Sequence, residues 1–327
     1  MNAPRRKSPP EDGAAPIAVA SPRTDAPFYR TAAAIFGVAL IVRLLHVYLL
    51  SRSPFFTALL GDARSYDEWG RRIAGGEWIG RDVFYQAPLY PYFLGVVYKV
   101  FGHSFWALRI TQALIGASSC ALLGLAGYRF VSTRVGVIAG FVLALYAPAI
   151  FFDALIQKSV LDLFFLTLSL WLVGRLVDAP LSRMNWIALG LAMGGLSLTR
   201  ENALVFVVVI VAWALWRSQL SLSVLDTQAD EHPRAGTAHR GAAGHAEVIP
   251  FASRVGLAAS FLAGLAIVLL PVAVRNYAVA GGFYLTTSQF GPNFYIGNNP
   301  QADGSYASLR FGRGAPEYER LDATELA

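Results

Sequence analysis

Long apolar runs separated by short charged segments are the main pattern along the chain. A helix of about 20 apolar residues crosses the hydrocarbon core of a bilayer. Seven runs are predicted to cross in this way: residues 31–50, 105–128, 135–152, 159–173, 186–198, 203–216 and 255–274. The pattern therefore predicts an all-α, polytopic membrane protein with about seven transmembrane helices.

Residues 86–102 form another apolar run, which begins at the proline-punctuated sequence APLYP and is too short to cross a bilayer comfortably. If this run crossed, Arg129, Arg134, Arg175 and Arg183 would lie outside, together with the long basic loop. The positive-inside rule disfavours that arrangement. We therefore expect a helix in the membrane interface, an N-terminus on the inside, and an outside location for the segment around Asp62.

The composition agrees with a membrane protein. The mean hydropathy is +0.47, and 55% of the residues are hydrophobic against 15% that are charged, which excludes an ordinary soluble domain. The net charge of +6 is spread over the loops, so it indicates topology rather than nucleic-acid binding. Cys120 is the single cysteine and lies in an apolar segment, so no intrachain disulfide can form.

Three segments fall outside the predicted spans. Residues 1–30 are rich in proline, alanine and charge and are expected to be a disordered cytoplasmic tail. Residues 218–254 are expected to be a flexible cytoplasmic loop, whose three histidines lack metal-ligand spacing. Residues 276–327 are expected to be an ordered extracytoplasmic loop with tight turns. The chain ends there without an eighth span, which is typical of a piece of a longer protein.

Residues 61–74 read as a short amphipathic helix with aromatic residues on one face. On its other face the spacing pairs Asp67 with Arg71 and Glu68 with Arg72 at i,i+4. Asp62 has no basic residue at i+4 and is therefore the carboxylate of this segment with the least evident structural role. Asp67 and Glu68 are its rivals for any catalytic role, but their arginines favour surface salt bridges.

More ionisable residues gather at the predicted outer ends of the spans: Arg109, Asp153, Lys158, Asp162, Arg200, Glu201 and Arg275. A carboxylate can act as general base on an acceptor hydroxyl. Arginine or lysine can stabilise the charge that develops on a leaving phosphate. This combination is what a transferase with a lipid-phosphate donor needs. The chain has no nucleotide-binding glycine motif, which disfavours a nucleotide-sugar donor.

Several motifs carry a family resemblance. The run from Asp62 to Tyr66 is followed by RRIAGGEW, APLYPY, FGHSFWALR, LTR and RNY. This order resembles the GT-C superfamily of integral-membrane glycosyltransferases, and above all bacterial relatives of dolichyl-phosphate-mannose protein mannosyltransferases and of lipid A aminoarabinose transferases. The resemblance covers roughly residues 31–306. It implies seven spans with two juxtamembrane helices in the first extracytoplasmic loop.

The resemblance also implies roles for individual residues. Asp62 would be the general base in an inverting transfer of a sugar from polyprenyl phosphate, on the periplasmic side of the inner membrane. Arg200 and Arg275 are assigned to the donor phosphate, with Lys158 as a weaker third. The acceptor would be a protein, lipid or glycan hydroxyl.

The predicted sugar or acceptor contacts are Tyr66, Tyr85, Gln86 and Tyr90. The family pattern is not complete here, because Ala63 stands where several members have glutamate. The sequence QAP at residues 86–88 also stands where many members have a histidine or lysine with two prolines. Because of these departures, the resemblance does not determine which acceptor is used or whether a divalent metal is required.

Two other functions are alternatives to glycosyl transfer. A transporter or flippase for a lipid-linked substrate would need charged residues in the middle of its spans and two related halves, and the sequence indicates neither. A catalytically silent subunit or fragment is the second alternative. Loss of activity on replacing Asp62 would separate the enzyme from both.

Overall fold

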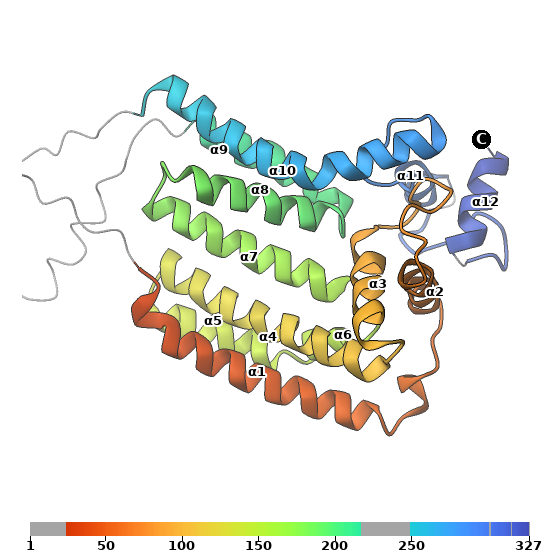
Figure 1. The fold of residues 1–327 in the computed structure, drawn as a ribbon, viewed down its shortest axis with the longest axis horizontal. Coiled ribbons are helices and arrows are strands. Elements are labelled where there is room, and N and C mark those ends of the chain that lie inside the picture. The colour runs from red at the N-terminus through yellow and green to blue at the C-terminus, as the bar shows by residue number, and fades with distance from the viewer. Residues whose placement is uncertain (1–23, 217–248, 301, 315, 327) are drawn as a thin grey trace, which may run out of the picture.

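The computed structural model describes residues 24–216, 249–300, 302–314 and 316–326 (Figure 1). All regular secondary structure in these residues is helical. The all-α fold predicted from the apolar runs is confirmed. The predicted loop at residues 218–248, with His232, His239 and His245, and the tail at residues 1–23 lie outside the described residues.

Most helices run side by side in one bundle (Figure 1). In chain order they are α1 (Tyr29–Leu50), α4 (Phe105–Phe130), α5 (Thr133–Leu145), α6 (Ala147–Ala154), α7 (Ser159–Asp178), α8 (Arg183–Ser197), α9 (Leu204–Trp216) and α10 (Phe251–Ala280). Helices α5 and α6 are the two halves of one bent pass, so the described chain makes seven passes. These passes coincide with the seven predicted runs.

Fewer than seven of these passes have the length of a membrane span. Four helices are long and apolar enough to cross a bilayer, namely α1, α4, α7 and α10, and the bent pair makes a fifth. The bend of 52° falls at Tyr146, whose backbone is extended between the two helices. Pro148 in the first turn of α6 has no backbone N–H that could continue α5. Helices α8 and α9 have 15 and 13 residues in the described chain, so by length and composition the count is four or five, not seven.

Glycines allow the closest helix contact, between α8 and α10. A Cβ on Gly190 would collide with the backbone of Phe261, and a Cβ on Gly264 would collide with the backbone of Ile187. Small residues let two helix backbones approach in this way. The glycine-rich run of α8 therefore serves packing.

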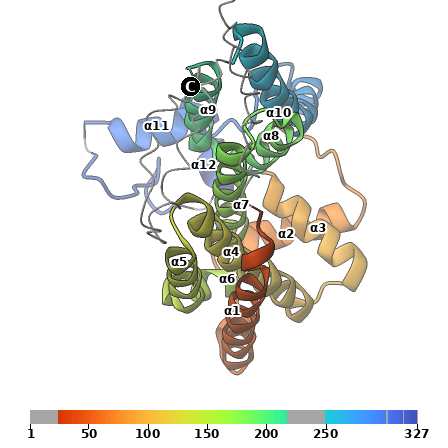
Figure 2. The same cartoon turned by 90° about the vertical axis from the view of Figure 1, so that its left-hand side faces the viewer.

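The helices outside the bundle gather at one end of it, which we call the site end (Figure 1). They are α2 (Asp62–Ala74), α3 (Leu89–Phe101), α11 (Phe290–Asn298) and α12 (Pro316–Leu326). Helix α3 lies across the direction of the bundle, in agreement with the interfacial helix expected at residues 86–102. Seen along the bundle, α3 and α11 lie on opposite sides (Figure 2).

Some predicted boundaries shift. Helix α1 begins at Tyr29, and the residues before it are packed, with Asp25 and Phe28 buried, so residues 24–30 are not part of a disordered tail. Helix α10 begins at Phe251, four residues before the predicted span.

A buried ion-pair cluster holds the opposite end of the bundle. Arg129 donates from Nε to Asp25 at 2.6 Å and from Nη1 to Asp178 at 2.5 Å. Trp171 donates from its indole N–H to the second oxygen of Asp25 at 3.3 Å. Buried charges need such paired, hydrogen-bonded partners. Arg129 was expected only to set the topology, and the structure shows that it also joins the chain before α1 to α4 and α7.

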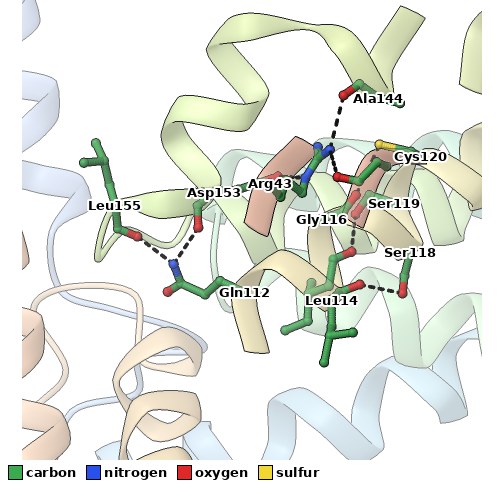
Figure 3. A network of polar contacts seen from close by, with 12 residues as sticks. Arg43, Gln112, Leu114, Gly116, Ser118, Ser119, Cys120, Ala144, Asp153 and Leu155 are labelled. Carbon is green, nitrogen blue, oxygen red and sulfur yellow. Dashed lines mark hydrogen bonds and ion pairs between the residues drawn. The ribbon is translucent and has the colours of Figure 1, made fainter. Parts of the chain in front are cut away.

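A second buried ion pair lies within the bundle (Figure 3). Arg43 of α1 donates from Nε to Asp153 of α6 at 2.7 Å, and both side chains are buried. Gln112 of α4 donates to the carbonyl oxygens of Asp153 and Leu155, each at 2.8 Å. Asp153 was predicted to be an outer-end charge, whereas it is the buried partner of Arg43. The expectation that the spans carry no internal charge is therefore wrong.

Candidate functional site

Asp62 is the first residue of α2 and lies at the site end of the bundle. The preceding Gly61 has φ +55°, a conformation that favours glycine, so the chain can turn sharply into the helix. Asp62 Oδ1 accepts a hydrogen bond from Gln86 Nε2 at 3.3 Å, and Gln86 Oε1 accepts one from Ser65 at 3.3 Å. A half-buried carboxylate is thus held at a helix N-terminus, where negative charge is favoured.

A cationic cluster lies beside Asp62. Arg200 donates from Nε to Asp162 Oδ2 at 2.6 Å, and its own side chain is 54% exposed. Burial lowers the pKa of Lys158, while Asp162, Glu201 and Asp62 act in the opposite direction. Lys158 is therefore within electrostatic range of Asp162, Arg200 and Asp62. Lys158 and Arg200 thus lie near Asp162, and their predicted contact with a donor phosphate stays a prediction.

Tyr66 and Tyr90 lie in the packed layer between α2 and α3. Both side chains are buried, and their rings meet edge to face with centroids 5.3 Å apart. Burial is the main cause that raises the pKa of Tyr66, and Asp62 and Asp162 raise it further. Tyr90 donates to Gln112 Oε1 at 2.6 Å, which connects this layer to the buried network of Figure 3. Their predicted contact with substrate stays a prediction.

Arg275 lies in different surroundings from Arg200. Its Nε donates to the carbonyl oxygen of Ile79 at 2.7 Å, its Nη2 donates to the same oxygen, and its Nη1 donates to Asn276 at 3.0 Å. The guanidinium stacks over the ring of Phe84 at 3.8 Å. Arg275 is thus fixed to the loop between α2 and α3, and no contact joins it to Lys158 or Arg200 within the described chain.

This loop and α2 enclose a pocket of about 370 Å³. Tyr85 and Gln86, two of the predicted substrate contacts, line it together with Arg275. Gln86 also binds Asp62, so the pocket begins beside the candidate base. The structure therefore separates the predicted cations, because Arg275 lines this pocket with Tyr85 and Gln86 whereas Lys158 and Arg200 do not.

The C-terminal segment adds a carboxylate that the sequence did not indicate. Glu319 of α12 is buried and accepts a hydrogen bond from Tyr306 at 3.1 Å. Burial, Glu319 and Asp62 raise the pKa of Tyr306 to about 12, and burial and Glu319 also raise the pKa of Tyr85. Glu319 lies in a polar segment without helical periodicity in its apolar residues, so no sequence signal distinguished it.

The two rival carboxylates are not paired as predicted. Asp67 is buried, and its Oδ1 accepts a hydrogen bond from Tyr98 at 2.6 Å and lies 2.8 Å from His103 Nε2. Glu68 accepts from Arg64 at 2.9 Å in an exposed pair. The surface salt bridge expected for Asp67 is therefore wrong, because Tyr98 of α3 and His103 in the loop after α3 cover that position. Among the described residues, no group of three or more His, Cys, Asp or Glu side chains is placed to hold a metal ion.

These features define an all-helical, polytopic membrane protein with a charged site at one end of its bundle. Residues 85–227 match a protein family described as dolichyl-phosphate-mannose-protein mannosyltransferase. The match confirms the resemblance to membrane glycosyltransferases of the GT-C type. It begins in the loop before α3 and does not include Asp62. No curated protein and no solved structure matches the chain.

Proposed function

We propose that this protein transfers a sugar from a polyprenyl-phosphate donor to an acceptor hydroxyl, with Asp62 as general base. The observation that supports the proposal most strongly is that Lys158 lies within electrostatic range of both Asp62 and Arg200 at the site end of the bundle. A carboxylate can remove the proton of the acceptor, and two cations can hold the phosphate that leaves. The family match supports glycosyl transfer as the reaction class.

The transfer is a single displacement that inverts the anomeric carbon. The acceptor oxygen attacks that carbon, its proton passes to Asp62, and the bond from carbon to phosphate oxygen breaks with its electron pair on the phosphate. Arg200 presents a half-exposed guanidinium that can bind phosphate bidentately, and Lys158 supplies a point charge. The apolar bundle beside them would accommodate the lipid tail.

The proposal includes an orientation in the membrane. The N-terminus would lie in the cytoplasm, and the site end with Asp62 would face the periplasm of a bacterial inner membrane. The arginines at the far end of the bundle, among them Arg129 and Arg134, support this orientation through the positive-inside rule.

The test is transfer of labelled sugar from a panel of polyprenyl-phosphate donors, with wild type beside Asp62→Asn. Asparagine keeps the shape of the side chain but cannot take the proton, so we expect a loss of at least about a hundredfold. Glu68→Gln is the matched control, because it makes the same chemical change on the exposed side of the same helix. Full activity in Asp62→Asn would remove Asp62 as the base. Absence of transfer from every donor, with folded protein, would favour the transporter or the silent subunit.

A further inference from the structure

Helix α2 presents two different faces after Asp62. Tyr66 is buried on the face that packs against α3. Ser65, Trp69 and Arg72 line the 370 Å³ pocket on another face. Residues spaced by i, i+4 and i+7 share one side of a helix, so this stripe leads from the first turn of α2 into the pocket. The pocket therefore opens next to the proposed base but contains neither Lys158 nor Arg200.

The pocket carries an excess of positive charge. Arg72, Arg81 and Arg275 line it, against the carboxylates of Glu77 and Asp82. Asp82 and Arg275 interact electrostatically. Arg72 and Arg81 have no carboxylate within ion-pair distance among the described residues. Two guanidinium groups on the pocket wall are thus available to an anionic ligand.

The other walls suit a sugar. The rings of Trp69 and Phe84 lie with centroids 5.5 Å apart, and Ser65, Tyr85 and Gln86 add hydroxyl and amide groups. Small-molecule sites typically enclose about 300–1,000 Å³ and combine aromatic walls with a few polar groups. Aromatic rings can cover the C–H face of a sugar, while arginine recognises carboxylate or phosphate bidentately.

We propose that this pocket is the acceptor subsite and that it takes a sugar bearing a carboxylate or phosphate group. This inference rests on the proposed function. In a displacement with inversion, the attacking hydroxyl and the leaving phosphate lie on opposite sides of the anomeric carbon, so they need separate subsites. Arg72 and Arg81 bind the acidic group, and the acceptor hydroxyl points to Asp62. Arg275, which the sequence assigned to the donor phosphate, belongs to the wall of this pocket.

Binding of simple glycosides to the purified full chain in lipid nanodiscs tests the assignment without a donor. The probes are methyl glucuronoside and methyl glucoside 6-phosphate, with methyl glucoside as the neutral reference, titrated by saturation-transfer NMR. At least one charged probe should bind about tenfold or more tightly than the neutral one. Arg72→Gln and Arg81→Gln should each remove most of this difference. Arg52→Gln is the matched control, since it removes one exposed arginine near the same end of the bundle but outside the pocket.

Equal binding of charged and neutral glycosides would overturn the inference. An equal loss of charged-probe binding in Arg52→Gln would also overturn it, because it would indicate a general effect of surface charge. Loss of charged-probe binding in Arg200→Gln, with normal binding in Arg81→Gln, would instead place the anion beside Lys158 and Arg200. The two proposals also fail separately. Sugar transfer that depends on Asp62 but uses only neutral acceptors would overturn the acceptor subsite alone, while selective binding with no transfer would overturn the transferase alone.

Discussion

At the residue scale, Lys158 has an environment that should be visible in the pH dependence of donor binding. Burial lowers its pKa below the ordinary lysine value, and the neighbouring carboxylates only partly offset that effect. As pH rises, Lys158 therefore loses its proton earlier than an exposed lysine would. Its charge is present below the lowered pKa and absent above it.

We expect the donor KM of the wild type to rise as pH increases from about 7 to about 10, because a neutral amine no longer attracts phosphate. In Lys158→Arg the guanidinium stays charged over this range, so the rise should be absent or much smaller. Lys99→Arg is the control, since Lys99 is exposed at the end of α3. Identical KM profiles for wild type and Lys158→Arg would show that Lys158 does not bind the donor.

At the element scale, α2 is held by side chains from two neighbouring elements. Asp67 binds Tyr98 of α3 and His103 just before α4, while Gly70 and Gly95 let α2 and α3 pack closely. A Cβ on Gly95 would collide with the side chain of Ile73. The position of Asp62 therefore depends on contacts made one and two turns further along its helix.

Replacing Asp67 should lower the stability of the fold more than it lowers the rate of sugar transfer. Asp67→Ala leaves the buried Tyr98 hydroxyl without its acceptor, which costs about 1–3 kcal/mol. We expect a lower Tm, with transfer activity retained at low temperature. Glu68→Gln removes an exposed ion pair and should change stability by less than about 1 kcal/mol. If Asp67→Ala folded normally but lost transfer as completely as Asp62→Asn, Asp67 would be the catalytic carboxylate.

At the scale of the whole molecule, apolar periodicity predicted the helices and their order but not their partners. The order of the helices in the bundle and the short helix across its end follow from the positions of the apolar runs and from arginine placement. The pairs Arg43–Asp153 and Arg129–Asp25 join residues 110 and 104 positions apart. Single-sequence patterns do not show which turns of two helices will meet. For the same reason the pairing of Asp67 and the position of Glu319 were missed.

The orientation of the whole bundle is open to a direct chemical test. Cys120 is the single cysteine and is fully buried, so a Cys120→Ala background carries no thiol. Thr57 lies exposed near the site end, and Thr133 lies exposed at the opposite end, at the start of α5. Thr57→Cys and Thr133→Cys therefore make a matched pair, with the same substitution at the two ends of one bundle.

A membrane-impermeant maleimide should modify Thr57→Cys in cells whose outer membrane alone has been opened, and Thr133→Cys only after the inner membrane is also broken. The expectation rests on the arginines around Thr133, because cytoplasmic loops carry the excess of Lys and Arg. The reverse pattern would place Asp62 in the cytoplasm. The positive-inside argument would then be wrong for this chain, and the donor sugar would have to reach the site from the cytoplasmic side.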